Sequence, residues 1–176
     1  MRGRDKLMEP VEGTPLLSRQ VTVAAQTGLP VTVALPPRPH PRYSIVRGAE
    51  VLEVPDAADG MGASLATGIG HLREADAVLL LLGDLPEITA ADLVAVLNAE
   101  APPGAIVRGA TEDGRPGHPL LIPRSAFADF EALKGDEGGQ RALARHAVLL
   151  LPLPGGRARL DLDTPEDWAA WRAGKK

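Results

Sequence analysis

The sequence contains no cysteine, which excludes a disulfide framework, a thiolate zinc site and a cysteine nucleophile. It also lacks any apolar stretch of the roughly 18 residues that a membrane-spanning helix needs. We therefore expect a cytoplasmic protein with no membrane partner, because a reducing compartment suits a chain without thiols.

Aromatic side chains and net positive charge are scarce as well. Aromatic residues make up only 3% of the 176 residues, so a core built from Ala, Leu and Val is expected. The formal net charge is −4, which disfavours broad attraction to nucleic acid, and we expect no nucleic-acid partner. A polyanionic substrate would need cations placed locally. The length predicts a single domain, residues 1–176.

Strand and helix patterns alternate along the chain. Apolar or β-branched runs predict strands at 30–35, 50–54, 77–82, 105–110, 118–123, 147–152 and 158–162. Helical spacing and capping residues predict helices at 15–27, 63–73, 89–99, 127–133 and 164–171. The run 77–82 is so apolar that we expect it to be buried on both faces. This alternation predicts an α/β fold with a mainly parallel sheet, in which ligands bind beyond the C-terminal ends of the strands.

Carboxylates follow two of these predicted strands. Asp84, in "GDLP", fits a polar turn residue and a hard-metal ligand equally well, because Mg²⁺ prefers carboxylate oxygens together with substrate phosphates. Asp161 and Asp163 are spaced i, i+2, which on a strand points both side chains to one side. Alone, this pair also fits a solvated strand end. Together the three acids predict a magnesium–phosphate site at one edge of the sheet.

Two other segments carry groups that bind phosphate. Lys6 is either a solvated surface lysine or the point-charge ammonium of a phosphate site. Residues 59–70, "DGMGASLATGIG", form a Gly-rich loop that enters a predicted helix and offers backbone N–H groups. The segment fails both G-x-G-x-x-G and G-x-S-x-G, which disfavours a dinucleotide-dependent oxidoreductase and a hydrolase nucleophile elbow.

These pieces occur in an order that resembles one family. The stretches are "MRGRDKLMEPVEGTPLL", "GMGASL", "GDLP", "GRPGHPLLIPRSAF", "LKGDEGGQRAL" and "LDLDTPEDW". They look like the molybdenum cofactor cytidylyltransferases, which belong with the molybdenum cofactor guanylyltransferases to a wider group of nucleotidyltransferases. The resemblance implies a three-layer, Rossmann-like nucleotidyltransferase fold with a mainly parallel mixed sheet.

The same resemblance implies an activity. The protein would be a Mg²⁺-dependent transferase that moves CMP from CTP to the phosphate of molybdopterin or the molybdenum cofactor and releases pyrophosphate. A molybdoenzyme or its chaperone would be a protein partner.

Motif by motif, the resemblance also implies site residues. Asp84 would bind the metal, with Asp161 and Asp163 at the second acidic position on the metal–triphosphate. Lys6 would contact the nucleotide phosphates. The other residues implied to bind the nucleotide are Arg2, Gly3, Arg4, Gly60, Gly62, Ser64 and Gly83.

The acceptor would lie near the turn that contains Gly117, His118 and Pro119. Many relatives carry Asn where His118 stands, so a structural use of this histidine is the competing interpretation.

The start of the sequence departs from the family pattern. The family begins with an apolar strand and a loop of the form L-A-A-G-x-S-x-R-M-G, and here Met1 falls where the methionine of that loop is expected. We expect the natural protein to begin upstream, with an in-frame apolar strand and a Gly/Ser loop.

Other functions fit the same residues. Guanylyl transfer, or nucleotidyl transfer onto a sugar or alcohol phosphate, would use the same metal ligands and lysine, and a screen of nucleoside triphosphates separates them. A catalytically inactive module that binds a ligand or partner enzyme is the alternative of a different class. Calorimetry with CTP and Mg²⁺ discriminates it from an enzyme.

Overall fold

The computed structural model describes residues 5–135 and 137–174. The strands are β1 (Pro10–Val11), β2 (Thr14–Pro15), β3 (Thr32–Leu35), β4 (Glu50–Glu53), β5 (Ala77–Leu80), β6 (Ile106–Ala110), β7 (Pro116–Pro123) and β8 (Val148–Pro152). The α-helices are α1 (Leu16–Ala25), α2 (Met61–His71), α3 (Ala90–Leu97), α4 (Phe127–Glu131), α5 (Gln140–Leu143) and α6 (Pro165–Gly174). Short 3₁₀ helices are η1 (Lys6–Met8), η2 (Pro41–Ser44), η3 (Ala57–Asp59) and η4 (Arg124–Ala126).

The strands pair in both directions. The largest sheet has the order β5-β7-β6-β8, in which β7 is antiparallel to both neighbours and β6 is parallel to β8. A separate pair, β3 and β4, is parallel, and β1 and β2 form a short antiparallel pair. The predicted mixed α/β fold is confirmed, with β7 as the strand that reverses direction.

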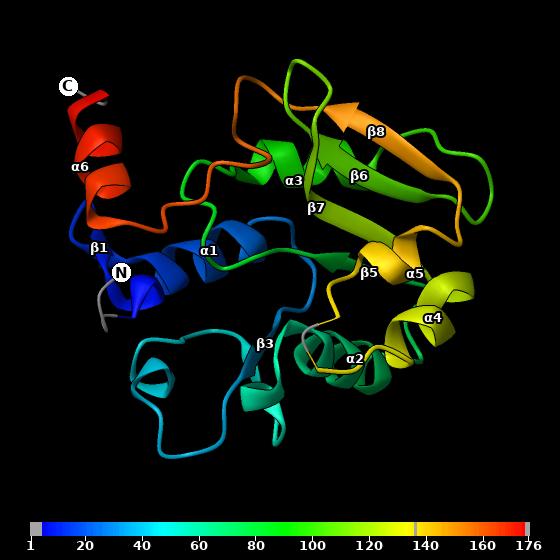
Figure 1. Ribbon diagram of the computed structural model, residues 1–176, viewed down its shortest axis with the longest axis horizontal. Coiled ribbons are helices and arrows are strands. Elements are labelled where there is room, and N and C mark those ends of the chain that lie inside the picture. Colours follow the sequence, from blue (N-terminus) through cyan, green and yellow to red (C-terminus); the bar gives the residue numbers. More distant parts are fainter. Residues whose placement is uncertain (1–4, 136, 175–176) are drawn as a thin grey trace.

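Helices cover both faces of the four-stranded sheet. Val78 and Leu80 of β5 pack in a core with side chains of α2, α4 and α5, whereas Leu79 packs in a second core with α3 and the end of α1. Alternate residues of a strand point to opposite faces, so these two cores lie on opposite sides of the sheet. The result is the three-layer arrangement seen in Figure 1, where α2, α4 and α5 gather on one side.

Two predictions about strands were wrong. The run 77–82 packs against cores on both faces but is only partly buried: β5 ends at Leu80, and among the described strands it pairs at one edge only, with β7. Residues 158–162 form no strand. The N–H groups of Arg159 and Leu160 both donate to Gly156 O, so this segment turns and then runs extended toward α6.

Capping hydrogen bonds mark the starts of two of the predicted helices, 89–99 and 164–171. Thr89 caps α3, and its hydroxyl and the Asp92 carboxylate exchange hydrogen bonds with each other's backbone N–H. Thr164 and Asp167 form the same reciprocal pair at the start of α6. These boxes satisfy N–H groups that the helix itself leaves unpaired.

Helix α6 anchors the C-terminal segment against the rest of the molecule. Trp168 is buried with Leu162, Val11 and Leu16, and its Nε1 donates to Leu162 O at 3.0 Å. Figure 1 shows α6 beside the N-terminal segment that carries β1. The chain just before α6 is thereby held close to η1. None of the described helices is long and apolar enough to cross a membrane.

A glycine in β7 fixes the other end of this segment. A Cβ atom on Gly117 would lie 2.1 Å from Ala158 O, and the N–H of His118 donates to the same oxygen at 2.8 Å. Only glycine therefore allows Ala158 to approach β7 so closely.

Gly117→Ala tests this constraint. The added methyl must push the 158–163 segment away, so we expect a loss of about 1–3 kcal/mol in the free energy of unfolding, as for other overpacked sites. Urea unfolding measures it. Gly156→Ala is the matched control, since a Cβ there meets nothing within 4 Å. Equal stability of the two variants would contradict the prediction.

Candidate active site

Three aspartates surround the side-chain ammonium of Lys6. The distances from Lys6 Nζ are 2.8 Å to Asp84 Oδ2, 2.9 Å to Asp161 Oδ1 and 2.7 Å to Asp163 Oδ1. The acids come from the turn after β5 and from the segment before α6, more than 70 residues apart in sequence. The structure thus brings together the three predicted acids and the predicted lysine at one point.

The cluster is only partly shielded from water. The Asp84 side chain is 20% exposed and that of Asp163 is 67% exposed. Partial burial lowers the pKa of Lys6, but hydrogen bonds to the three carboxylates outweigh it and raise that pKa above its ordinary value. Burial and the neighbouring carboxylates raise the pKa of Asp161, whereas the contact with Lys6 lowers that of Asp163. One ammonium therefore does not fully neutralise the acids around it.

A chain of contacts places Lys6 in the cluster. Asp5 caps η1 by accepting a hydrogen bond from Leu7 N at 3.1 Å. Nε and Nη2 of Arg42 donate to the two oxygens of the same carboxylate, at 2.7 and 2.9 Å. Leu7 packs against Gly83, where an added Cβ would already touch the leucine at 3.4 Å. Leu7 of η1 therefore lies directly against the turn that carries Asp84.

Buried contacts hold the Asp84 turn. Leu85 is buried, and its carbonyl oxygen accepts a hydrogen bond from Nε2 of the buried Gln20 in α1 at 2.9 Å. Glu87 accepts from Nε1 of Trp171 at 2.8 Å, which ties the turn to α6. The turn that carries Asp84 is thus held by contacts from both α1 and α6.

The donor set fits a hard divalent cation in chemistry. Carboxylate oxygens are what Mg²⁺ and Mn²⁺ prefer, and three of them converge here. The place between them is taken by the Lys6 ammonium, and in the described parts of the chain no group of three or more acidic, His or Cys side chains is set to hold a metal as it stands. A metal at this point requires Lys6 to move away. The role of these aspartates as ligands stays a prediction.

The Gly-rich segment, residues 59–70, packs against the turn after α4 and is not part of the acid cluster. Gly60 precedes α2 with φ 124°, a conformation that favours glycine. The N–H of Gly62 donates to Gly135 O at 2.9 Å, and a Cβ on this residue would lie 2.7 Å from Glu137 O. Gly62 thus packs on the turn after α4, and its N–H is already used. Ser64 is half-buried in α2. Figure 1 shows α2 beside α4, away from the N-terminal segment.

The predicted acceptor turn lies in β7, and its histidine faces charges of both signs. His118 is half-buried, and its Nδ1 is a buried atom with no hydrogen-bond partner among the described residues. Burial, followed by the positive charge of Arg108, lowers the pKa of His118 to about 4, while Asp84 opposes this shift. The charge of Asp84 therefore reaches His118. Gly117 and Pro119 are both buried.

Some expectations fall outside this cluster. Arg2, Gly3 and Arg4 lie outside the described residues. The sequence interpretation missed two other cations, Arg108 in β6 and Arg159 before Asp161. Arg108 carried a usable signal, because it is a single charged residue inside an otherwise apolar strand, "AIVRGA".

Comparisons with known proteins define the class. The sequence profile of the MobA-like NTP transferase domain matches residues 1–149. The crystal structure of Rv0371c from Mycobacterium tuberculosis H37Rv in complex with manganese superposes with a TM-score of 0.79 at 27% identity, over 94% of this chain and 89% of that one. A search of curated proteins found no match.

More distant structures share the fold. The molybdopterin-guanine dinucleotide biosynthesis protein A from Archaeoglobus fulgidus is 14% identical with a TM-score of 0.71, over 99% of this chain and 93% of that one. CMP:2-keto-3-deoxy-manno-octonic acid synthetase in complex with CTP is 16% identical with a TM-score of 0.73, over 97% and 91%. The protein is a nucleotidyltransferase with a Rossmann-like fold. It belongs to the MobA-like NTP transferase domain family.

Lys6→Met tests whether lysine and metal share one place. Removing the ammonium leaves the carboxylates without their cation, so we expect Mn²⁺ to bind on the order of tenfold tighter in the absence of nucleotide. Titration calorimetry with Mn²⁺ measures the change. Lys134→Met, a lysine remote from the acids in sequence and location, should leave the affinity unchanged. Weaker or equal Mn²⁺ binding by Lys6→Met would contradict this prediction.

His118 also predicts a pH dependence of stability. The pKa of His118 is 6.5 in the unfolded chain and is lowered to about 4 in the folded protein. Between these two values the unfolded chain binds a proton that the folded protein does not. The contribution of His118 is therefore fully present above pH 6.5 and is lost as the pH falls toward 4, by at most about 3 kcal/mol. We expect His118→Asn to lose less stability than the unchanged protein between pH 7 and pH 4.5, measured by urea unfolding. Parallel profiles would contradict the prediction.

Proposed function

We propose that the protein transfers the nucleoside monophosphate of an NTP, with CTP favoured, to the phosphate of molybdopterin or the molybdenum cofactor and releases pyrophosphate. The observation that carries the proposal is the meeting of Asp84, Asp161 and Asp163 around Lys6. This constellation supplies anionic oxygen ligands and a cation for phosphates within a few ångströms, and phosphoryl transfer needs positioning and charge neutralisation more than a covalent nucleophile.

In this mechanism each residue has one task. Asp84, with Asp163 and Asp161, would hold a divalent cation, taken to be Mg²⁺, which supplies Lewis-acid and template chemistry when bound. Lys6 would turn from the carboxylates to the nucleotide phosphates and offset the negative charge that grows on the departing pyrophosphate. The packing of Leu7 against Gly83 and the hydrogen bond from Gln20 to Leu85 O would keep the turn that carries Asp84 in place.

Base and acceptor preference come from the motif resemblance. Arg2, Gly3, Gly60, Gly62, Ser64 and Gly83 are proposed to line the nucleotide, and Gly117, His118 and Pro119 the acceptor. We further propose a cytoplasmic location and a molybdoenzyme or its chaperone as partner. Guanylyl transfer to the same acceptor, or cytidylyl transfer to a sugar or alcohol phosphate, would use the same acids and lysine.

Asp84→Asn tests the activity and the metal ligand together. Pyrophosphate release is measured with each of the four NTPs, Mg²⁺ and molybdopterin, and we expect the highest turnover with CTP. Loss of one anionic ligand should lower kcat by on the order of 100-fold or more while the fold is kept. Asp76→Asn is the control, because Asp76 lies fully exposed before the other end of β5.

Two results would count against this proposal. Normal turnover by Asp84→Asn would remove this residue from the metal site. No pyrophosphate release by the unchanged protein with any of the four NTPs would remove the proposed transfer itself.

A further inference from the structure

Two arginines near the acids lack an anionic partner. Arg108 is half-buried in β6, and its Nε donates to Gly117 O at 2.9 Å. Nη1 of Arg159 donates to Pro116 O at 3.4 Å. Within the described residues neither guanidinium has a carboxylate within 4.0 Å, although the neighbouring Arg115 pairs with Asp113 at 2.9 Å.

The two guanidinium groups donate to the carbonyl oxygens of consecutive residues, Gly117 and Pro116, and the positive charge of one acts on the other. Burial and the positive charge of Arg159 both lower the pKa of Arg108. Like charges held together without a counter-ion destabilise the protein that contains them, and the repulsion is relieved when an anion binds. Arginine suits a phosphate in particular, because its planar fork can donate two parallel hydrogen bonds to it.

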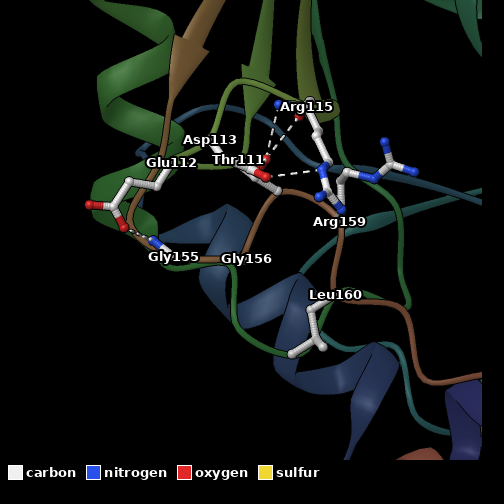
Figure 2. A pocket seen from close by; sticks show the side chains of 8 residues that line it. All are labelled: Thr111, Glu112, Asp113, Arg115, Gly155, Gly156, Arg159 and Leu160. Atoms are coloured by element: carbon white, nitrogen blue, oxygen red, sulfur yellow. Dashed lines mark hydrogen bonds and ion pairs between the residues drawn. The ribbon is translucent and has the colours of Figure 1, made fainter.

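A cleft lies beside one member of this pair, Arg159. It has a volume of about 410 Å³, and its lining residues are Thr111, Glu112, Asp113, Arg115, Gly155, Gly156, Arg159 and Leu160. Figure 2 shows the Arg159 side chain extending past Arg115 and away from the two acids. The negative charges of the cleft are already engaged: Asp113 pairs with Arg115, and Glu112 accepts from Gly155 N at 3.2 Å. A cleft of this size takes a small organic molecule.

The pair also adjoins the acid cluster. Arg159 is two residues before Asp161, and the charges of both Arg108 and Asp84 act on His118. The N–H of His118 and the close approach of Gly117 bind β7 to Ala158, next to Arg159. Arg108, Asp84 and the segment that carries Arg159 therefore all lie near one histidine, His118.

We propose that Arg108 and Arg159 form the subsite that binds the phosphate monoester of the acceptor, with the organic body of the acceptor in the adjoining cleft. This inference rests on the proposed transfer to a phosphorylated acceptor and identifies where that phosphate binds. The acceptor phosphate then lies next to the acids at which the NTP is held, so one of its oxygens can attack the α-phosphorus as pyrophosphate leaves. His118 is the residue shared by the two subsites.

The test uses Arg108→Gln, Arg159→Gln and the double variant of the full chain. Arg73→Gln is the control, because it removes the same charge from an exposed surface position whose nearest acid is Glu74. Binding of phenyl phosphate is measured by calorimetry without nucleotide or metal. We expect each single variant to bind at least about tenfold more weakly than the unchanged protein, because charge-assisted hydrogen bonds are lost. Thermal unfolding checks that each variant is folded. If Arg108→Gln does not fold, Arg159→Gln, at an exposed site, still tests the subsite.

Turnover separates acceptor phosphate from nucleotide phosphate. We expect the acceptor KM to rise at least about tenfold in the variants while the CTP KM changes less than about twofold. Equal phenyl phosphate binding by the double variant and the unchanged protein overturns the subsite, as does an equal rise of both KM values. If phenyl phosphate binding is lost in the variants and no NTP is turned over by the unchanged protein, the anion subsite stands and the proposed transfer falls.

Discussion

The contact of Lys6 with three carboxylates is the interaction on which the site depends. It joins η1, the turn after β5 and the segment before α6, which are remote from one another in sequence. Without a cation between them, three acids at this separation would repel one another. Because Asp161 and Asp163 are well exposed, the ion pairs alone hold these segments weakly. The apolar contacts of Trp168 and the close packing at Gly117 must therefore position the acids before any cation binds.

In the proposed mechanism the same contact would couple metal binding to nucleotide binding. Three carboxylates carry more negative charge than one ammonium neutralises, which would favour a divalent cation in the place of the Lys6 ammonium. A lysine released from the acids would then be free to bind phosphate. In the proposed mechanism a nucleotide that draws Lys6 away would strengthen metal binding, and by linkage a metal that displaces Lys6 would strengthen nucleotide binding by the same factor.

The parts of the structure that follow from local chemistry could be predicted from the sequence. Thr89 with Asp92, and Thr164 with Asp167, mark helix starts because the hydrogen bonds lie within one turn. Asp84 could be placed at a strand end because Gly83 and Pro86 interrupt an apolar run. The half-burial of β5 and the reversal at β7 depend on which strands become neighbours, and a one-dimensional pattern does not contain that. Residues 158–162 have a strand-like pattern, but the turn at Gly156 and the contact with Gly117 decide their path.

The stability of the folded protein does not explain why Arg108 stands in strand β6. An apolar residue in place of Arg108 would continue β6 and remove the repulsion by Arg159, so packing alone gives no reason for a charge there. A charge that weakens the folded protein at a half-buried position is best explained by what it binds. Asp84 and Arg108 act on the same histidine with charges of opposite sign. Under the proposed function, a neutral His118 would add no charge to either subsite, so a metal-bound nucleotide and an acceptor phosphate could be held side by side.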